Sequence, residues 1–153
     1  KGRACLLVLA ERKSRDTLIF KMRAQTQKEV QRQLNKLERK IGFKRFIKKF
    51  KSITVDNGSE FLDWRSLEES CISKGTLPRT QIYYCHPYSS WERGTNEQIN
   101  GHLRRFIPKG CAISDYSTTK IQKIEDWLNN YPRKILNGQS AIEFIKGELN
   151  KCA

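Results

Sequence analysis

Residues 53–61 read ITVDNGSEF, an apolar and β-branched run that ends in Asp-Asn-Gly. β-branched residues favour a strand, whereas Asp-Asn-Gly favours a turn, because Asp and Asn tolerate turn geometry and Gly adopts positive φ. The sequence therefore predicts a strand that ends at Val55 and presents the carboxylate of Asp56 in a cleft at the edge of a sheet. Taken alone, the motif is more often an ordinary Asx-Gly turn, since such turns are very common.

A second motif follows at residues 87–97, which read PYSSWERGTNE. It predicts the start of a helix that carries Glu97 and is capped by Ser89 or Ser90. On this helix the apolar side chains recur at i, i+4 and i+7 and are expected to face the core; they are Ile99, Leu103 and Phe106.

The polar stripe of the same helix contains Arg93, Glu97 and Arg104. This spacing predicts that Glu97 faces a cleft, between two cations that can reach phosphate groups. A surface ion pair between Arg93 and Glu97 is the alternative, with a contribution of only a few tenths of a kcal/mol. Together, Asp56 and Glu97 could bind one divalent metal ion.

The charge of the chain favours nucleic acid as its partner. The formal net charge is +14 and the sequence pI is about 9.8. Residues 1–55 hold 17 Lys or Arg against 4 Asp or Glu, and residues 56–153 hold 13 against 12. Such a basic surface is typical of phosphate binding, although a single lysine is as often part of a solvated helix face.

The remaining pattern predicts one α/β domain over residues 1–153, large enough to bury a core. The expected elements are strands over residues 4–10 and 17–22 joined by a turn over 12–16, a helix from the Thr26 capping box to Gly42, a basic helix over 43–51, a helix over 63–73, a strand over 81–85, a helix over 118–130, and a helix from the Ser140 capping box. The Phe residues of 43–51 are interpreted as core rather than as a surface for nucleic-acid bases.

Several ordered motifs extend the pattern along almost the whole chain. They are ERKSR at 11–15, the two motifs above, NGHLR at 100–104, PKG at 108–110 and LNNYPRK at 128–134. In this order they resemble the catalytic core of insertion-sequence transposases of the IS30 family, within the retroviral-integrase-like superfamily.

The resemblance implies an RNase H-like fold, with a mixed five-stranded sheet flanked by helices, and an Asp-Asp-Glu (DDE) triad. Such a triad binds two Mg²⁺ ions, for which Mn²⁺ can substitute, during DNA cleavage and strand transfer. By motif position Asp56 is the second acidic residue of the triad and Glu97 is the third. The first lies, in the family, on a central strand upstream of the segment that resembles residues 1–15. We therefore expect the chain to lack that strand, and we interpret Glu11 and Asp16 as turn residues.

The implied partner is double-stranded DNA, both transposon ends and target, bound mostly through its backbone and in a salt-dependent manner. Recognition of the end sequence is expected from a helix-turn-helix region outside this chain. The residues expected to contact DNA are Arg93, Asn96, Arg104, Arg105 and Lys109. The basic loop at 132–134 is a further candidate, or a solubility feature. A homodimer or higher oligomer is expected, because loss of the first strand leaves sheet edges unpaired.

Two further expectations concern spacing and location. The 40 residues between Asp56 and Glu97 exceed what is usual in the family, which predicts an extra turn or loop within residues 63–80. No apolar run approaches the roughly 20 residues that span a membrane, and no signal peptide is recognisable, so a cytoplasmic, nucleoid-associated protein is expected. The five cysteines form no C-x-x-C pair, which favours reduced thiols over disulfides; zinc at Cys85, His86 and His102 is disfavoured.

Two alternatives to a transposase core stay open. One is a catalytically silent DNA-binding or assembly module from a truncated transposase. The other is an RNase H-type nuclease that acts on RNA–DNA hybrids, which the WERGTNE motif disfavours.

Overall fold

The computed structural model describes residues 3–73, 75, 77–86 and 94–151 and shows a mixed α/β chain. It divides into two compact units, the first formed by Lys1–Cys5 and Met22–Glu92 and the second by Leu6–Lys21 and Arg93–Ala153. The prediction of a single domain stays a prediction.

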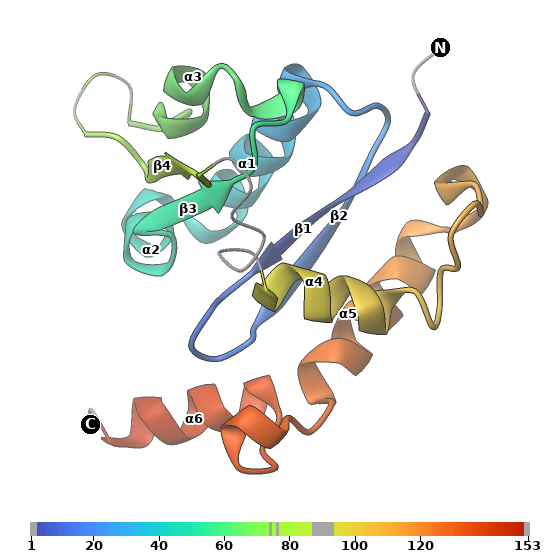
Figure 1. Ribbon diagram of the computed structural model, residues 1–153. Helices are drawn as coiled ribbons and strands as arrows, with labels where there is room; N and C mark the ends of the chain where they lie inside the picture. The colour runs from blue at the N-terminus through green and yellow to red at the C-terminus, as the bar shows by residue number, and fades with distance from the viewer. Residues whose placement is uncertain (1–2, 74, 76, 87–93, 152–153) are drawn as a thin grey trace. The chain divides into compact units, whose positions relative to one another are not determined.

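The first unit is built on two parallel strands. Its elements are α1 (Gln27–Ile41), α2 (Phe43–Lys49), β3 (Ser52–Val55), the short 3₁₀ helix η1 (Ser59–Phe61), α3 (Trp64–Glu68) and β4 (Gln81–Tyr84). β3 pairs with β4 from Ser52 opposite Gln81 to Val55 opposite Tyr84. Figure 1 shows α1, α2 and α3 around these two strands. The predicted strands at 52–55 and 81–85 are confirmed to within one residue.

Local signals define α1 at both ends. The Thr26 hydroxyl accepts a hydrogen bond from the backbone N–H of Glu29 (3.4 Å), and Gly42 ends the helix at φ 83°, where other residues are strained. The capping box is half formed, since the Glu29 carboxylate accepts from the N–H of Arg23 (3.1 Å) while the N–H of Thr26 donates to the carbonyl of Ala24. The predicted start and end of this helix are confirmed.

The short basic helix α2 is also confirmed, with its aromatic residues in the core. Phe46 is 0% exposed and packs 4.7 Å from the ring of Phe50, centroid to centroid, whereas Lys44, Arg45 and Lys48 are exposed. The interpretation of this segment as a core-anchored helix therefore holds for Phe46.

The predicted helix over 63–73 is wrong in extent. α3 stops at Glu68, and Glu69 is extended (φ −68°, ψ 129°). Beyond it the Ser70 hydroxyl accepts from the N–H groups of Ile72 (3.1 Å) and Ser73 (2.8 Å), and the Glu38 carboxylate of α1 accepts from the N–H of Cys71 (3.0 Å). Side chains thus take the backbone donors that a longer helix would use. That this loop is longer than in the family stays a prediction.

A buried ion pair holds this loop against α1. Arg79 and Glu38 are both 0% exposed, and their Nη1 and Oε2 atoms lie 3.0 Å apart. Arg79 also donates through Nε to the carbonyl of Leu67 (2.7 Å) and through Nη1 to Oδ1 of Asn35 (2.6 Å). The Ser70 hydroxyl completes the shell around Glu38. This network fixes the approach to β4.

Glu38 also sets an acid limit on stability. Burial raises the pKa of its carboxyl, but hydrogen bonds from Ser70, Cys71 and Arg79 lower it more, so the pKa lies below its ordinary value. A lowered pKa stabilises the fold above the unfolded value near 4.3 and loses this effect as pH falls through the folded value. We expect the urea midpoint to fall from pH 5 to pH 3, and to fall less in Glu38→Gln. If the urea midpoint changed equally with pH in the two proteins, this role of Glu38 would be contradicted.

The outer edge of β4 is closed by a side chain. The backbone N–H groups of Gln81 and Cys85 donate toward β3, to the carbonyls of Lys51 and Val55, whereas the N–H of Ile82 donates to the Glu68 carboxylate of α3 (2.7 Å). The edge that faces away from β3 is therefore occupied at this position.

The second unit combines a β-hairpin with helices. Its elements are β1 (Cys5–Ala10), β2 (Thr17–Met22), α4 (Gly94–Leu103), η3 (Ile113–Asp115), α5 (Thr118–Asn130), η4 (Lys134–Leu136) and α6 (Ala141–Lys151), with Cys5 and Met22 at the outer strand ends belonging to the first unit. One apolar core joins the hairpin to α4 and α5; its buried members are Ile19, Ile99, Leu103, Ile107, Ile121, Ile124 and Leu128. The inward face predicted for the helix of Glu97 is confirmed for Ile99 and Leu103, whereas Phe106 lies beyond the end of α4 and is partly buried against the same core.

The turn between β1 and β2 confirms the role expected for Glu11. Its carboxylate accepts the backbone N–H groups of Lys13 (2.9 Å) and Ser14, and Arg15 occupies the left-handed region (φ 64°). Asn129 of α5 then pairs with Thr17 twice, accepting from its N–H (2.9 Å) and donating to its carbonyl (2.8 Å).

Other expectations for the fold have mixed outcomes. The Ser140 capping box is fully formed, with bonds of 2.7 and 3.3 Å exchanged with Glu143. The four strands assigned to the described residues form two pairs, β1 with β2 and β3 with β4, so the expected five-stranded sheet is not seen among them. Cys5, Cys71, Cys85 and Cys111 are free thiols. Among residues whose placement is known, no helix is long and apolar enough to cross a membrane.

Candidate functional site

Asp56 lies at the carboxyl end of β3, as the sequence predicts. It is partly exposed, and its Oδ1 accepts the N–H of Gly58 (3.3 Å). The turn is tied to the end of β4, because Asn57 donates through Nδ2 to the carbonyl of Cys85 (3.3 Å) and the N–H of Cys85 donates to the carbonyl of Val55 (2.9 Å). The carboxyl ends of parallel strands are where α/β sheets commonly bind ligands.

A second carboxylate, Glu60, stands beside Asp56. A Cβ built on Gly58 would meet Oε2 of Glu60 at 2.7 Å and Oδ1 of Asp56 at 3.0 Å, so both oxygens border the same point. Glu60 is only 9% exposed and accepts from Nε2 of Gln25 (2.7 Å). Burial and then the charges of Glu60 and Glu29 raise the pKa of the Cys5 thiol. Sequence reasoning missed Glu60, although its i+4 spacing from Asp56 across a tight turn was a signal.

The donor chemistry of this turn fits a hard divalent cation. Carboxylate oxygens are the ligands that Mg²⁺ prefers, and Asp56 and Glu60 present them at one turn. Within the described ranges, however, no group of three or more His, Cys, Asp or Glu side chains is arranged to hold a metal ion. The described part of this site is therefore an incomplete ligand set.

The absence of a side chain at Gly58 keeps both carboxylates in place. Gly58 has φ −64°, which any residue can adopt, so Gly58→Ala acts by contact alone. We expect it to lower the free energy of unfolding by about 1–2 kcal/mol, because Glu60 must leave Gln25. In Gly101→Ala the new Cβ meets nothing within 4 Å and should stabilise the helix by about 0.5–1 kcal/mol. Chemical denaturation measures the free energy of unfolding of both variants. If Gly58→Ala left this free energy unchanged, Glu60 would not be held in place by Gln25.

Glu97 belongs to the second unit, in the first turn of α4. It is exposed, while Ile99 and Leu103 on the same helix are buried, as expected of a polar stripe opposite an apolar one. Because Asp56 and Glu97 lie in different units, each is placed only within its own. That they share a metal stays a prediction.

The residues predicted to contact DNA have different outcomes. Arg104, Arg105 and Lys109 are exposed and Asn96 is half-buried. Arg93 lies outside the described residues, as do the proposed caps Ser89 and Ser90.

The basic loop at 132–134 is exposed at only part of its length. Its contact with DNA stays a prediction. Lys134 is exposed, but Arg133 is 3% exposed and donates through Nη2 to the carbonyl of Leu128 (3.2 Å). A run of basic residues was read as surface, whereas the backbone turn directs one of them inward.

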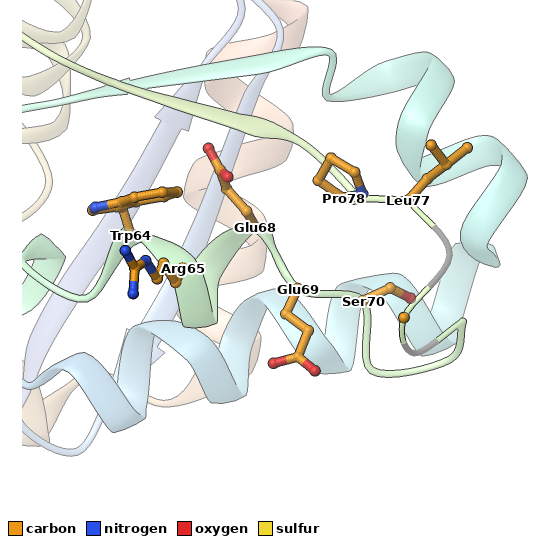
Figure 2. Close-up of a pocket in the computed structure, with 8 residues that line it drawn as sticks. Trp64, Arg65, Glu68, Glu69, Ser70, Leu77 and Pro78 are labelled. Carbon is orange, nitrogen blue, oxygen red and sulfur yellow. The ribbon is translucent and has the colours of Figure 1, made fainter.

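A separate pocket of about 340 Å³ opens in the first unit (Figure 2). It lies between α3 and the segment before β4, where Arg65 stands 5.3 Å from the ring of Trp64, and Glu68, Leu77 and Pro78 also line it. None of the residues predicted for catalysis or DNA binding lines this pocket.

Comparison with known proteins identifies several relatives of the chain. No protein-family model matches it. It is 42% identical over 96 residues to the probable transposase for insertion-like sequence element IS1161 of Streptococcus salivarius, covering 63% of this chain and 25% of that protein. It is 40% identical over 100 residues to the transposase for IS4351 of Bacteroides fragilis, covering 65% and 28%.

A third relative extends over almost the whole chain. Transposase InsI for insertion sequence element IS30C of Escherichia coli K12 is 33% identical over 141 residues, which are 92% of this chain and 34% of that protein. The chain thus spans about a quarter to a third of the length of these relatives. By sequence, the chain belongs to the IS30 family of insertion-sequence transposases.

Proposed function

We propose that this chain is part of the catalytic core of a DNA transposase, with Asp56 and Glu97 as carboxylate ligands for Mg²⁺ and Mn²⁺ as its substitute. One observation carries the proposal: in a relative of named transposases, the DNG motif sets Asp56 at the carboxyl end of β3, in a turn bonded to β4. The finer parts of the proposal are an RNase H-like fold with a mixed five-stranded sheet, to which the described strands contribute, and a further acidic ligand from the longer protein.

The proposed reaction is strand cleavage followed by strand transfer. Water attacks a phosphodiester at the transposon end and frees a 3′-hydroxyl. This hydroxyl then attacks a phosphodiester of target DNA, joins to its phosphorus and releases a 3′-hydroxyl of the target strand. When bound, a divalent metal lowers the pKa of the attacking hydroxyl and offsets the charge that develops at phosphorus. In this reaction the chain supplies the two carboxylates, and the hydrogen bond from the N–H of Gly58 orients the carboxylate of Asp56.

DNA is proposed to bind through the backbone. Arg104, Arg105 and Lys109 are exposed at and beyond the end of α4, and with Arg93 and Asn96 they are the proposed phosphate contacts. The net charge of +14 supports a strongly salt-dependent affinity.

The experiment is a strand-transfer assay with the complete gene product on end-labelled duplex DNA. Joined products are expected with Mn²⁺ or Mg²⁺ and none with EDTA. Binding of DNA without any cleavage or joining, under all metal conditions, would establish the silent binding module instead. An added RNA–DNA hybrid tests the nuclease alternative, since cleavage of the hybrid alone would replace the transposase proposal.

A further inference from the structure

In the part of the chain that the structure describes, buried nitrogen atoms of three side chains of the second unit have no hydrogen-bond partner. They are Nε and Nη1 of Arg133, Nε of Arg15 and Nδ1 of His102. Arg133 is 3% exposed, and among the described residues its guanidinium donates one hydrogen bond, to the carbonyl of Leu128. A buried charge without a counter-ion is costly, and native proteins seldom keep one without a reason.

The three side chains are close enough to act on one another. Burial is the main cause of the lowered pKa of both Arg133 and His102. The charge of Arg15 also lowers the pKa of Arg133, and the charges of Arg133 and then Arg105 also lower the pKa of His102. Two of the three contact one ring: the centroid of Tyr131 lies 5.1 Å from that of His102 and 5.6 Å from Cζ of Arg133. In the described part of the chain, no carboxylate forms an ion pair with Arg15 or Arg133.

The backbone around this group is fixed in advance. The double hydrogen bond between Thr17 and Asn129 ties the hairpin next to Arg15 to the end of α5. The N–H of Arg133 donates to the carbonyl of Gln139 (2.9 Å), and its carbonyl accepts from Gly138 (3.0 Å). Nη1 of Arg15 donates to the hydroxyl of Thr95. Burial raises the pKa of the Glu11 carboxyl, but hydrogen bonds from Ser14 and Lys13 and then the charge of Arg15 lower it more. Glu11 thus offsets part of the charge of Arg15, whereas the hydrogen bonds that Arg133 donates to described residues go to neutral carbonyl groups.

We propose that the cluster of Arg15, His102 and Arg133 binds one phosphate group of the DNA backbone. Guanidinium groups match the oxygens of phosphate, and the half-exposed Arg15 and His102 can meet the group while buried Arg133 supplies charge behind them. Exposed Arg105, which acts electrostatically on His102, would continue the contact along the strand. DNA as the source of the phosphate rests on the proposed function, whereas the anion site itself does not.

The test compares Arg15→Gln and Arg133→Gln with Lys123→Gln, which removes one charge from the exposed side of α5. Binding of a fluorescent duplex to the chain is measured by anisotropy across a NaCl series, with EDTA present. For the two arginine variants we expect the slope of log K against log salt to decrease by about 1 and affinity to fall roughly tenfold. Lys123→Gln should change the slope and the affinity much less. Because EDTA excludes catalysis, this result is independent of strand transfer.

A second readout does not depend on any variant. The chain has two histidines, His86 and His102, so NMR can follow both imidazoles. A bound phosphate raises the pKa of His102, and we expect this shift with inorganic phosphate and with duplex DNA, with His86 as the reference. A shift with phosphate alone would overturn DNA as the ligand. No shift with either, together with arginine variants that behave like Lys123→Gln, would overturn the site.

Discussion

Asp56→Asn in the complete gene product is expected to lower the rate of Mn²⁺-dependent strand transfer by at least about 10²–10³-fold, since the stabilisation of charge at phosphorus is lost. Asn keeps the shape of the side chain and an oxygen that accepts the N–H of Gly58. The substitution therefore removes charge and leaves the turn intact. Single-turnover joining of a pre-cleaved end measures the chemical step, and chemical denaturation should show unchanged stability.

Asp63→Asn is the matched control for this experiment. Asp63 is an exposed carboxylate of the same unit that caps α3 by accepting the N–H of Ser66 (3.3 Å), and Asn caps helices equally well. Its strand transfer should equal that of the unmodified protein. If Asp56→Asn retained full activity in Mn²⁺, Asp56 would not be a metal ligand and the catalytic proposal would fail.

Arg79→Met is expected to lower the free energy of unfolding by about 3–5 kcal/mol, because it leaves the Glu38 carboxylate buried without its counter-ion. Both side chains are fully buried, and Arg79 also loses its bonds to Leu67 and Asn35. The loop before β4 should loosen first. Urea denaturation measures the loss, and hydrogen exchange at Cys71 and Ile82 reports where it begins.

Arg39→Met provides the comparison for Arg79→Met, since Arg39 is exposed on the same helix as Glu38. It should change stability by less than about 0.5 kcal/mol. The double variant Arg79→Met with Glu38→Leu is expected to recover part of the loss, because no charge then stays buried alone. A single variant as stable as Arg39→Met would mean that the pair contributes little.

The sequence predicted those elements whose signals are local. The start of α1 at Thr26, its end at Gly42 and the Ser140 capping box depend on residues within four positions of one another, and all three were confirmed. The extent of α3 was wrong because the acceptor that competes for the N–H of Cys71 is Glu38, 33 residues earlier. Periodicity within a window cannot contain that contact.

The same difference between local and long-range signals applies to the candidate site. Asp56 and its turn follow from a motif of three adjacent residues, and the structure places them as expected at the end of β3. Glu60 was missed because its proximity to Asp56 depends on how Gly58 turns and on Gln25, 35 residues away. The burial of Arg133 was not predicted, because composition suggested a surface loop, whereas the burial depends on the fold of the turn that follows.

The bond from Ile82 to Glu68 bears on how copies of this protein can meet. A free strand edge is a template on which another chain can add a strand. At β4 an incoming strand would have to displace a carboxylate already bonded to the backbone at 2.7 Å, and the same helix would obstruct its path. At this position the edge of β4 is therefore a poor template for strand addition by a second copy, because its backbone donor is already satisfied within the chain.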